Sequence, residues 1–107
     1  MSTVMILLTK SLEKRFAEIG DQADAEDPII VAKFFNPVGP GTWYAAAYDS
    51  KRRIFFGYVS LFGGYMDEWG YFSHDELQSY KGPYGLGIER DLSWKEKKAS
   101  AVIPQRA

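Results

Sequence analysis

The fold is decided by residues 42–59, which read TWYAAAYDSKRRIFFGYV. Two runs within this stretch, 42–48 and 53–59, are rich in the aromatic and β-branched residues that favour strands. The polar segment 49–52 separates the two runs and is short enough to form a turn. These residues therefore predict a β-hairpin, which is the clearest strand pairing in the sequence.

Further strands are predicted on both sides of this hairpin. Residues 29–35 precede it and residues 68–72 follow it, and both runs are rich in β-branched or aromatic residues. Residues 86–92 are a weaker candidate for a last short strand. Breaks rich in glycine and proline at 36–41, 63–64 and 82–83 separate these runs.

Two helices are predicted from apolar spacing and capping residues. Residues 9–20 place apolar side chains at helical intervals, with Thr9 as the N-cap and Gly20 at the end. A second helix is predicted from Ser73 to about Lys81, because Ser73 and Glu76 have the spacing of a capping box.

We therefore expect an α+β protein with a single domain, residues 1–92, followed by a polar C-terminal tail, residues 93–107. The domain is expected to contain an antiparallel meander of four to five strands, with both helices packed on one face. If side chains alternate along the first strand of the hairpin, Trp43, Ala45 and Ala47 point to one side and Tyr44, Ala46 and Tyr48 to the other. In the second strand, Ile54, Phe56 and Tyr58 point to one side and Phe55, Gly57 and Val59 to the other. Both faces are thus apolar, so the second face needs the tail, a partner molecule or a second copy to cover it.

Composition narrows the classes of protein to which this chain can belong. The 107 residues are 46% hydrophobic and 25% charged, with a net charge of −1 and an isoelectric point near 5.8. Because there is no cysteine, disulfides and thiolate metal sites are excluded. Lys and Arg are not in excess, as they usually are in dedicated nucleic-acid-binding domains. The apolar run at residues 4–8 is too short for a signal peptide or a membrane span, so we expect a cytoplasmic protein without a membrane partner.

No catalytic, cofactor-binding or metal-binding residues are predicted, and no cofactor is expected. His74 is the only histidine and is interpreted as a surface residue at a helix start. The glycines of residues 82–87 follow a helix and precede a strand, which is the reverse of the order in a phosphate-binding loop.

Carboxylates give a third hypothesis, a small hydrolase or transferase that uses Glu89 and Asp91. Together with Asp67 and Glu68 they could converge as an acid–base pair if the strand at 68–72 lies beside the strand at 86–92. The competing interpretation is a local ion-pair cluster that includes Arg90 and ties the C-terminal segment to the sheet.

Several short motifs resemble those of a known family. They read AKFFNP at 32–37, TWYA at 42–45, FFG at 55–57, GYFS at 70–73 and GLGIERDL at 85–92. Their order and spacing are similar to those of a small, uncharacterised bacterial family carried on plasmids, phages and conjugative elements, in some cases near antirestriction genes. The resemblance implies an accessory protein of mobile DNA and supplies no catalytic residues. Residues 51–53, 61–66 and the segment after Lys95 depart from the family pattern.

The expected function is therefore a non-enzymatic, protein-binding accessory protein of a mobile genetic element. Its partner would be a host or element-encoded protein, and an inhibitor of restriction or CRISPR machinery (an anti-CRISPR or antirestriction protein) fits this expectation. Phe, Tyr and Trp make up 16% of the chain, more than one small core obviously requires, and interfaces favour aromatic and Arg side chains. The predicted partner-binding residues are Trp43, Tyr44, Lys51, Arg52, Arg53, Phe62, Tyr65 and Trp69.

The main alternative is a module that binds single-stranded nucleic acid. Phe56 and Tyr58 are two residues apart beside the basic turn 51–53, a spacing at which bases could stack on one sheet face. A homodimer that covers the second apolar face is also compatible with the sequence.

Overall fold

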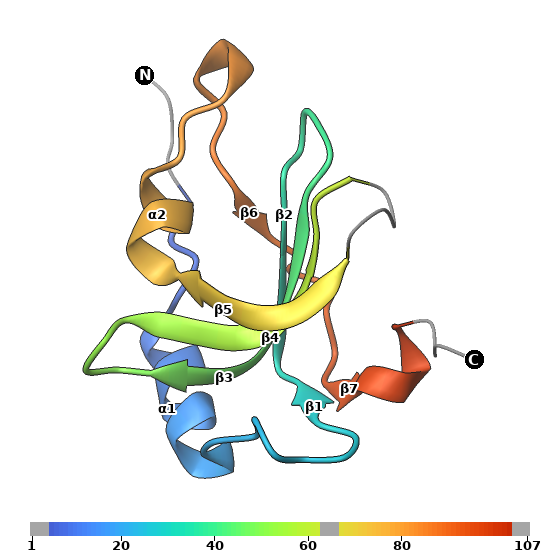
Figure 1. Ribbon diagram of the computed structural model, residues 1–107. Helices are drawn as coiled ribbons and strands as arrows, with labels where there is room; N and C mark the ends of the chain where they lie inside the picture. Colours follow the sequence, from blue (N-terminus) through green and yellow to red (C-terminus); the bar gives the residue numbers. More distant parts are fainter. Residues whose placement is uncertain (1–4, 63–66, 104–107) are drawn as a thin grey trace.

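The computed structural model describes residues 5–62 and 67–103. The chain is an α+β protein, as predicted, and the described residues form a five-stranded antiparallel sheet, a separate two-stranded pairing and two α-helices (Figure 1). In chain order the elements are α1 (Lys10–Ile19), β1 (Ile29–Ile30), β2 (Ala32–Phe35), β3 (Thr42–Asp49), β4 (Ile54–Ser60), β5 (Glu68–Ser73), α2 (His74–Ser79), the 3₁₀ turn η1 (Pro83–Gly85), β6 (Glu89–Arg90), β7 (Lys97–Lys98) and the 3₁₀ turn η2 (Ala99–Ala101). Neither α-helix is long and apolar enough to cross a membrane, within the part of the chain described.

The large sheet is a meander with one returning strand. Its order is β5-β4-β3-β2-β6, so the predicted hairpin β3–β4 lies at the centre. β6 returns to pair with β2, where Phe34 lies opposite Arg90. β5 and β6 are therefore the two edges of the sheet, separated by three strands.

A β-bulge changes the face pattern of β3. Ala45 lies opposite Gly57 and Ala47 opposite Phe56, so one extra residue is inserted between the two pairs. As a result Tyr48 packs with the helix-side core, on the same face as Ala45, and not on the face of Tyr44 as simple alternation predicts. The pattern of β4 is as predicted: Phe55 packs toward the helices, and Phe56 and Tyr58 belong to the opposite face.

The two helices pack on one face of the sheet, as predicted. Phe16 of α1 and Leu77 of α2 are buried in the same core, around the fully buried Phe55. The predicted caps are present: Thr9 Oγ1 accepts a hydrogen bond from the Leu12 amide at 3.2 Å, and Ser73 Oγ accepts one from the Glu76 amide at 3.1 Å.

Gly20 ends α1 at a left-handed φ of 73° and donates its amide hydrogen to the carbonyl of Phe16. Such a backbone conformation favours glycine, which explains why the helix stops where the sequence predicts.

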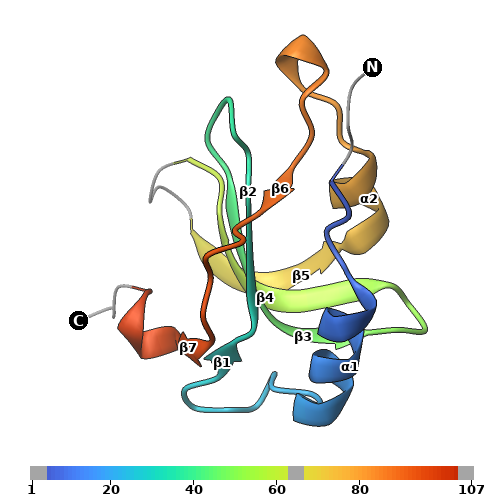
Figure 2. The same ribbon diagram turned by 180° about the vertical axis from the view of Figure 1, so that it is seen from behind.

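The opposite face of the sheet receives residues 94–103, which are part of the predicted polar tail. β7 pairs antiparallel with β1, and Ala99 and Ile103 are buried against Ile30 and Ala46. The Trp94 indole donates a hydrogen bond to the Ile30 carbonyl at 3.0 Å. Figure 2 shows this C-terminal segment (red) on the far side of the sheet from α1 and α2. The fold therefore extends at least to Ile103, and the strand predicted at 29–35 is divided into β1 and β2.

Candidate functional site

The predicted partner-binding residues do not form one surface. Trp43 is half-buried on the helix-covered face, whereas Tyr44 and Trp69 lie on the opposite face. Residues 51–53 form the β3–β4 turn at the end of the hairpin. Neighbouring strand residues such as Trp43 and Tyr44 point to opposite faces, so their aromatic side chains cannot act together.

A hollow of about 540 Å³ on the helix side is lined by Trp43 and Phe62 among other apolar side chains. Phe62 is 62% exposed, and Tyr80 of the same hollow is 42% exposed. Tyr65, the neighbouring predicted residue, lies outside the described residues. This surface offers apolar contact, and Glu76 is the charged residue among those that line it.

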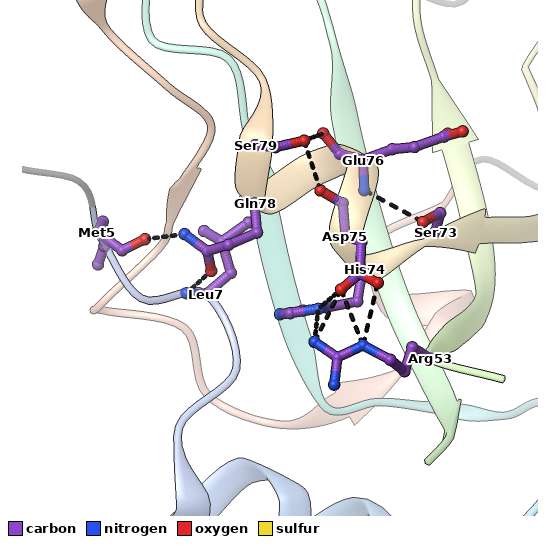
Figure 3. A network of polar contacts seen from close by, with 9 residues as sticks. All are labelled: Met5, Leu7, Arg53, Ser73, His74, Asp75, Glu76, Gln78 and Ser79. Carbon is purple, nitrogen blue, oxygen red and sulfur yellow. Dashed lines mark hydrogen bonds and ion pairs between the residues drawn. The ribbon is translucent and has the colours of Figure 1, made fainter. Parts of the chain in front are cut away.

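Arg53 belongs to a polar network that connects the hairpin turn to α2 (Figure 3). Its Nε lies 2.9 and 3.0 Å from the two carboxylate oxygens of Asp75, and its Nη2 lies 2.8 Å from Oδ1. The same Oδ1 is 2.9 Å from Nδ1 of His74. Hydrogen bonds from Arg53 and His74 lower the pKa of Asp75 to about 2.

The expectation that His74 is a surface residue is wrong. Its side chain is only 12% exposed, and its ring contacts Tyr48 and Phe55 with centroid distances of 6.3 and 6.1 Å. The local helix-start pattern identified the cap but could not show that the sheet turns the ring inward. His74 therefore packs against the core while its Nδ1 faces Asp75.

Gln78 of α2 extends this network to the N-terminal segment (Figure 3). Its Oε1 accepts a hydrogen bond from the Leu7 amide at 2.9 Å, and its Nε2 donates one to the Met5 carbonyl at 2.7 Å. The network as a whole holds α2, the β3–β4 turn and residues 5–7 together. Arg53, one of the predicted partner-binding residues, is therefore also the residue that connects the β3–β4 turn to α2.

Four of the contacting rings on the face opposite the helices form a group along β4 and β5, which we call the aromatic row: Tyr58, Trp69, Phe56 and Tyr71. Tyr58 lies opposite Trp69, and Phe56 opposite Tyr71, in the pairing of β4 with β5. The ring centroids are 5.5 Å apart for Tyr58–Trp69, 5.8 Å for Phe56–Trp69 and 5.2 Å for Phe56–Tyr71. Trp69 is 38% exposed and Tyr71 is 70% exposed, so the row is open to solvent along β5.

A hollow of about 490 Å³ adjoins the aromatic row. Phe56, Tyr58 and Trp69 line one side, and residues 22–28 line much of the other. The charged residues that line it are Glu26, Asp27 and Glu68, and no Lys or Arg is among them. At neutral pH the hollow therefore combines aromatic faces with negative charge, a combination that attracts a cation.

The three carboxylates of this hollow differ in how they are held. Asp27 accepts hydrogen bonds from the amide and hydroxyl of Ser100 at 2.9 and 2.6 Å, which lower its pKa. Glu26 and Glu68 are exposed, and the ion pairs of the described residues involve neither of them. Glu26 can therefore pair with a cationic group beside the aromatic row, whereas Glu68 directly precedes Trp69 in β5 and points its side chain to the other face of the sheet.

Gln22 holds the acidic segment beside the sheet. It is 8% exposed, and its Nε2 donates to the carbonyls of Ile29 and Ala46 at 2.8 and 2.6 Å. Its Oε1 accepts a hydrogen bond from the Ile29 amide at 2.8 Å. This buried amide side chain fixes the distance between residues 22–28 and the second face.

The condition for an acid–base pair of carboxylates is not met. Glu68 lies in β5 and Glu89 in β6, at opposite edges of the sheet. Asp91 lies 4.0 Å from the Lys33 ammonium group, and Arg90 donates to the carbonyls of Ile6 and Leu7. The segment therefore ties the C-terminal part of the chain to β2 and to the N-terminal residues. Among the described residues, no three His, Cys, Asp or Glu side chains are grouped so that they could hold a metal ion.

A family model described as "Protein of unknown function (DUF2958)" matches residues 7–105. The chain belongs to the DUF2958 family. The matched range includes residues 93–103, in agreement with their packing on the sheet. No curated protein and no solved structure matches the chain.

Sequence reasoning missed two residues of this surface in the DUF2958 chain: Tyr71 and Glu26. Tyr71 could have been found, because it lies two residues after Trp69 and a strand places such residues on one face. The position of Glu26 beside the rings depends on the buried contact of Gln22, for which the sequence carries no local signal.

Proposed function

We propose that this chain is a non-enzymatic, protein-binding module whose aromatic row contacts a partner protein. The observation that carries the proposal is the exposure of Trp69 and Tyr71 in the aromatic row, where Trp69 also lines the hollow that contains Glu26 and Asp27. Trp and Tyr supply much of the binding energy at the centres of protein interfaces. Monomeric proteins rarely leave contiguous aromatic surface open without a binding role.

The charge beside the row favours a protein partner over nucleic acid. Phe56 and Tyr58 could stack with bases, but single-strand binding also needs a positively charged groove for the phosphates. The adjoining hollow is instead lined by Glu26 and Asp27, and no Lys or Arg of the described residues lines it. In the basic turn, Arg53 is paired with Asp75, and Arg52 lies 3.7 Å from Asp49.

We also propose that the partner is a component of host defence, such as a restriction or CRISPR nuclease, and that the chain acts in the cytoplasm as an accessory protein of mobile DNA. The resemblance to a family carried on plasmids, phages and conjugative elements supports a role in mobile DNA. Nucleases present basic surfaces to nucleic acid, and an acidic, aromatic surface is complementary to such a surface.

The test is affinity capture of the tagged protein from its native host after nuclease treatment, read by mass spectrometry. The variant Trp69→Ala/Tyr71→Ala removes the exposed rings of the row. Tyr84→Ala is the matched control, because Tyr84 is 92% exposed but lies in η1, away from the row. A partner recovered with wild type and control but lost with the double variant supports the proposal. Equal recovery with all three proteins overturns it.

A further inference from the structure

The two edges of the sheet differ in how they are covered. At one edge, β6 has two residues, and Arg90 of this strand donates to the carbonyls of Ile6 and Leu7. At the other edge, β5 has six residues, and no backbone hydrogen bond among the described residues joins its outer side. Figure 1 shows β5 (yellow) crossing in front of β2 and β3. A long, uncovered edge strand is a template for pairing with another chain.

In the pairing of β4 with β5, the residues of β5 whose backbone groups point outward are those that carry the rings of the aromatic row. The His74 amide donates to the Arg53 carbonyl at 3.0 Å, which makes this a hydrogen-bonded pair. The β4–β5 register continues without a bulge, so hydrogen-bonded and non-hydrogen-bonded pairs alternate along it. The amide and carbonyl groups of Trp69 and Tyr71 therefore point away from β4, toward the open edge.

We propose that the partner contributes an extended, basic segment that pairs antiparallel with β5 and adds a sixth strand to the sheet. This inference rests on the proposed function and names the chemistry of the partner. In antiparallel pairing, segment residues bonded to Trp69 and Tyr71 point their side chains to the same face as the rings. Arg or Lys at alternate positions would therefore lie over the aromatic row, on the side of the sheet where Glu26 and Asp27 line the adjoining hollow.

Charge complementarity selects this occupant. A guanidinium group stacks on aromatic faces and pairs with carboxylates in bidentate geometry, so Arg satisfies both features of the surface. A second copy of the chain would bring a further Glu26 and Asp27 to a surface that is already acidic, which opposes pairing of β5 with itself. Gly70 adds no steric barrier, since the space around its Cβ position is open.

The test uses the isotope-labelled full chain and a blocked peptide of alternating Arg and Thr, of the same six-residue length as β5. Binding is measured by NMR titration, with the Trp69 indole signal as the site-specific reporter. One derivative is N-methylated at each Arg, and a matched derivative is N-methylated at each Thr. Because the Arg amides would bond to β5, methylation there should weaken binding by about tenfold or more, and methylation at Thr should change it by less than about threefold.

The outcomes separate this inference from the proposed function. Strand addition is supported if methylation at Arg weakens binding while methylation at Thr does not, and if the same peptide with Glu in place of Arg does not bind. Equal effects of the two methylations overturn it, as does a concentration-dependent dimer that occupies β5. In either of these cases a captured partner that depends on Trp69 and Tyr71 would still support the proposed function.

Discussion

Arg53 and Asp75 form an ion pair in which Nη2 of the guanidinium lies 2.8 Å from the carboxylate. The two residues are separated by 22 positions, and the pair joins the β3–β4 turn to the first turn of α2. A backbone hydrogen bond joins the same two elements, because the His74 amide donates to the Arg53 carbonyl.

Replacement of Asp75 by Asn is expected to lower the thermal midpoint at neutral pH. The pKa of Asp75 is about 2 in the folded protein and 3.8 in its ordinary state. A lowered folded-state pKa contributes stability that is present above about pH 4 and is lost as the pH falls toward 2. The midpoint difference between wild type and Asp75→Asn should therefore shrink over this range. Glu76→Gln is the control, because Glu76 lies in the same helical turn, and equal behaviour of the two variants would contradict the assignment.

The facing pair Gly57 and Gly70 should tolerate a methyl group very differently. A Cβ at Gly57 would overlap the Tyr44 carbonyl oxygen of the neighbouring strand, whereas the position at Gly70 is open. Gly57→Ala is expected to lower the free energy of unfolding by about 3 kcal/mol or more, as severe overpacking does. Gly70→Ala should change it by less than about 0.5 kcal/mol. Urea denaturation measures both values, and similar losses would be inconsistent with this strand packing.

Gln22→Ala is expected to lower the free energy of unfolding by about 2 kcal/mol or more, because it leaves buried backbone groups without partners. The groups affected are the Ile29 amide and the carbonyls of Ile29 and Ala46. Asp24→Ala, an exposed change in the same segment, serves as the control and should have little effect. If both variants unfold at the same urea concentration, Gln22 does not hold this segment.

Trp94→Ala tests whether residues 94–103 belong to the fold. The change removes the hydrogen bond to the Ile30 carbonyl and the ring contact with Tyr44. It also removes the contact between the Trp94 ring and the Lys97 ammonium group, which lies 4.5 Å from the ring centroid. We expect a loss of about 2 kcal/mol in the free energy of unfolding, less than for a fully buried Trp. Leu92→Ala, at a residue that is 75% exposed, should be nearly neutral. An unchanged stability for Trp94→Ala would show that this segment contributes nothing to the fold.

The features predicted correctly from the sequence depend on nearby residues. Thr9 and Ser73 cap the helices that follow them, and the hairpin of β3 and β4 forms where a polar turn separates two apolar runs. Faces of β4 also follow from alternation, because nothing interrupts its register. These signals act over a few residues, so a single sequence is enough to identify them.

The features that were missed depend on distant contacts. The bulge near Ala46 arises where β3 pairs with β4, and it places Tyr48 on the helix side. Pairing of Lys97 and Lys98 with β1 folds the C-terminal segment onto the sheet, although its own composition is polar. The position of β6 beside β2, far from β5, separates Glu89 from Glu68 and could not be read from strand order along the chain.

Site-specific crosslinking tests the central claim, that the aromatic row binds a protein, most directly. A photoreactive benzoylphenylalanine replaces Tyr71 in one protein and Tyr84 in a second, and both are irradiated in the native host before nuclease treatment and mass spectrometry. Both tyrosines are exposed, so the two sites differ chiefly in their place on the fold. We expect one protein adduct from position 71, with the crosslink in an Arg- or Lys-rich segment, and none from position 84. Adducts with nucleic acid alone, or the same protein adducts from both positions, would contradict it.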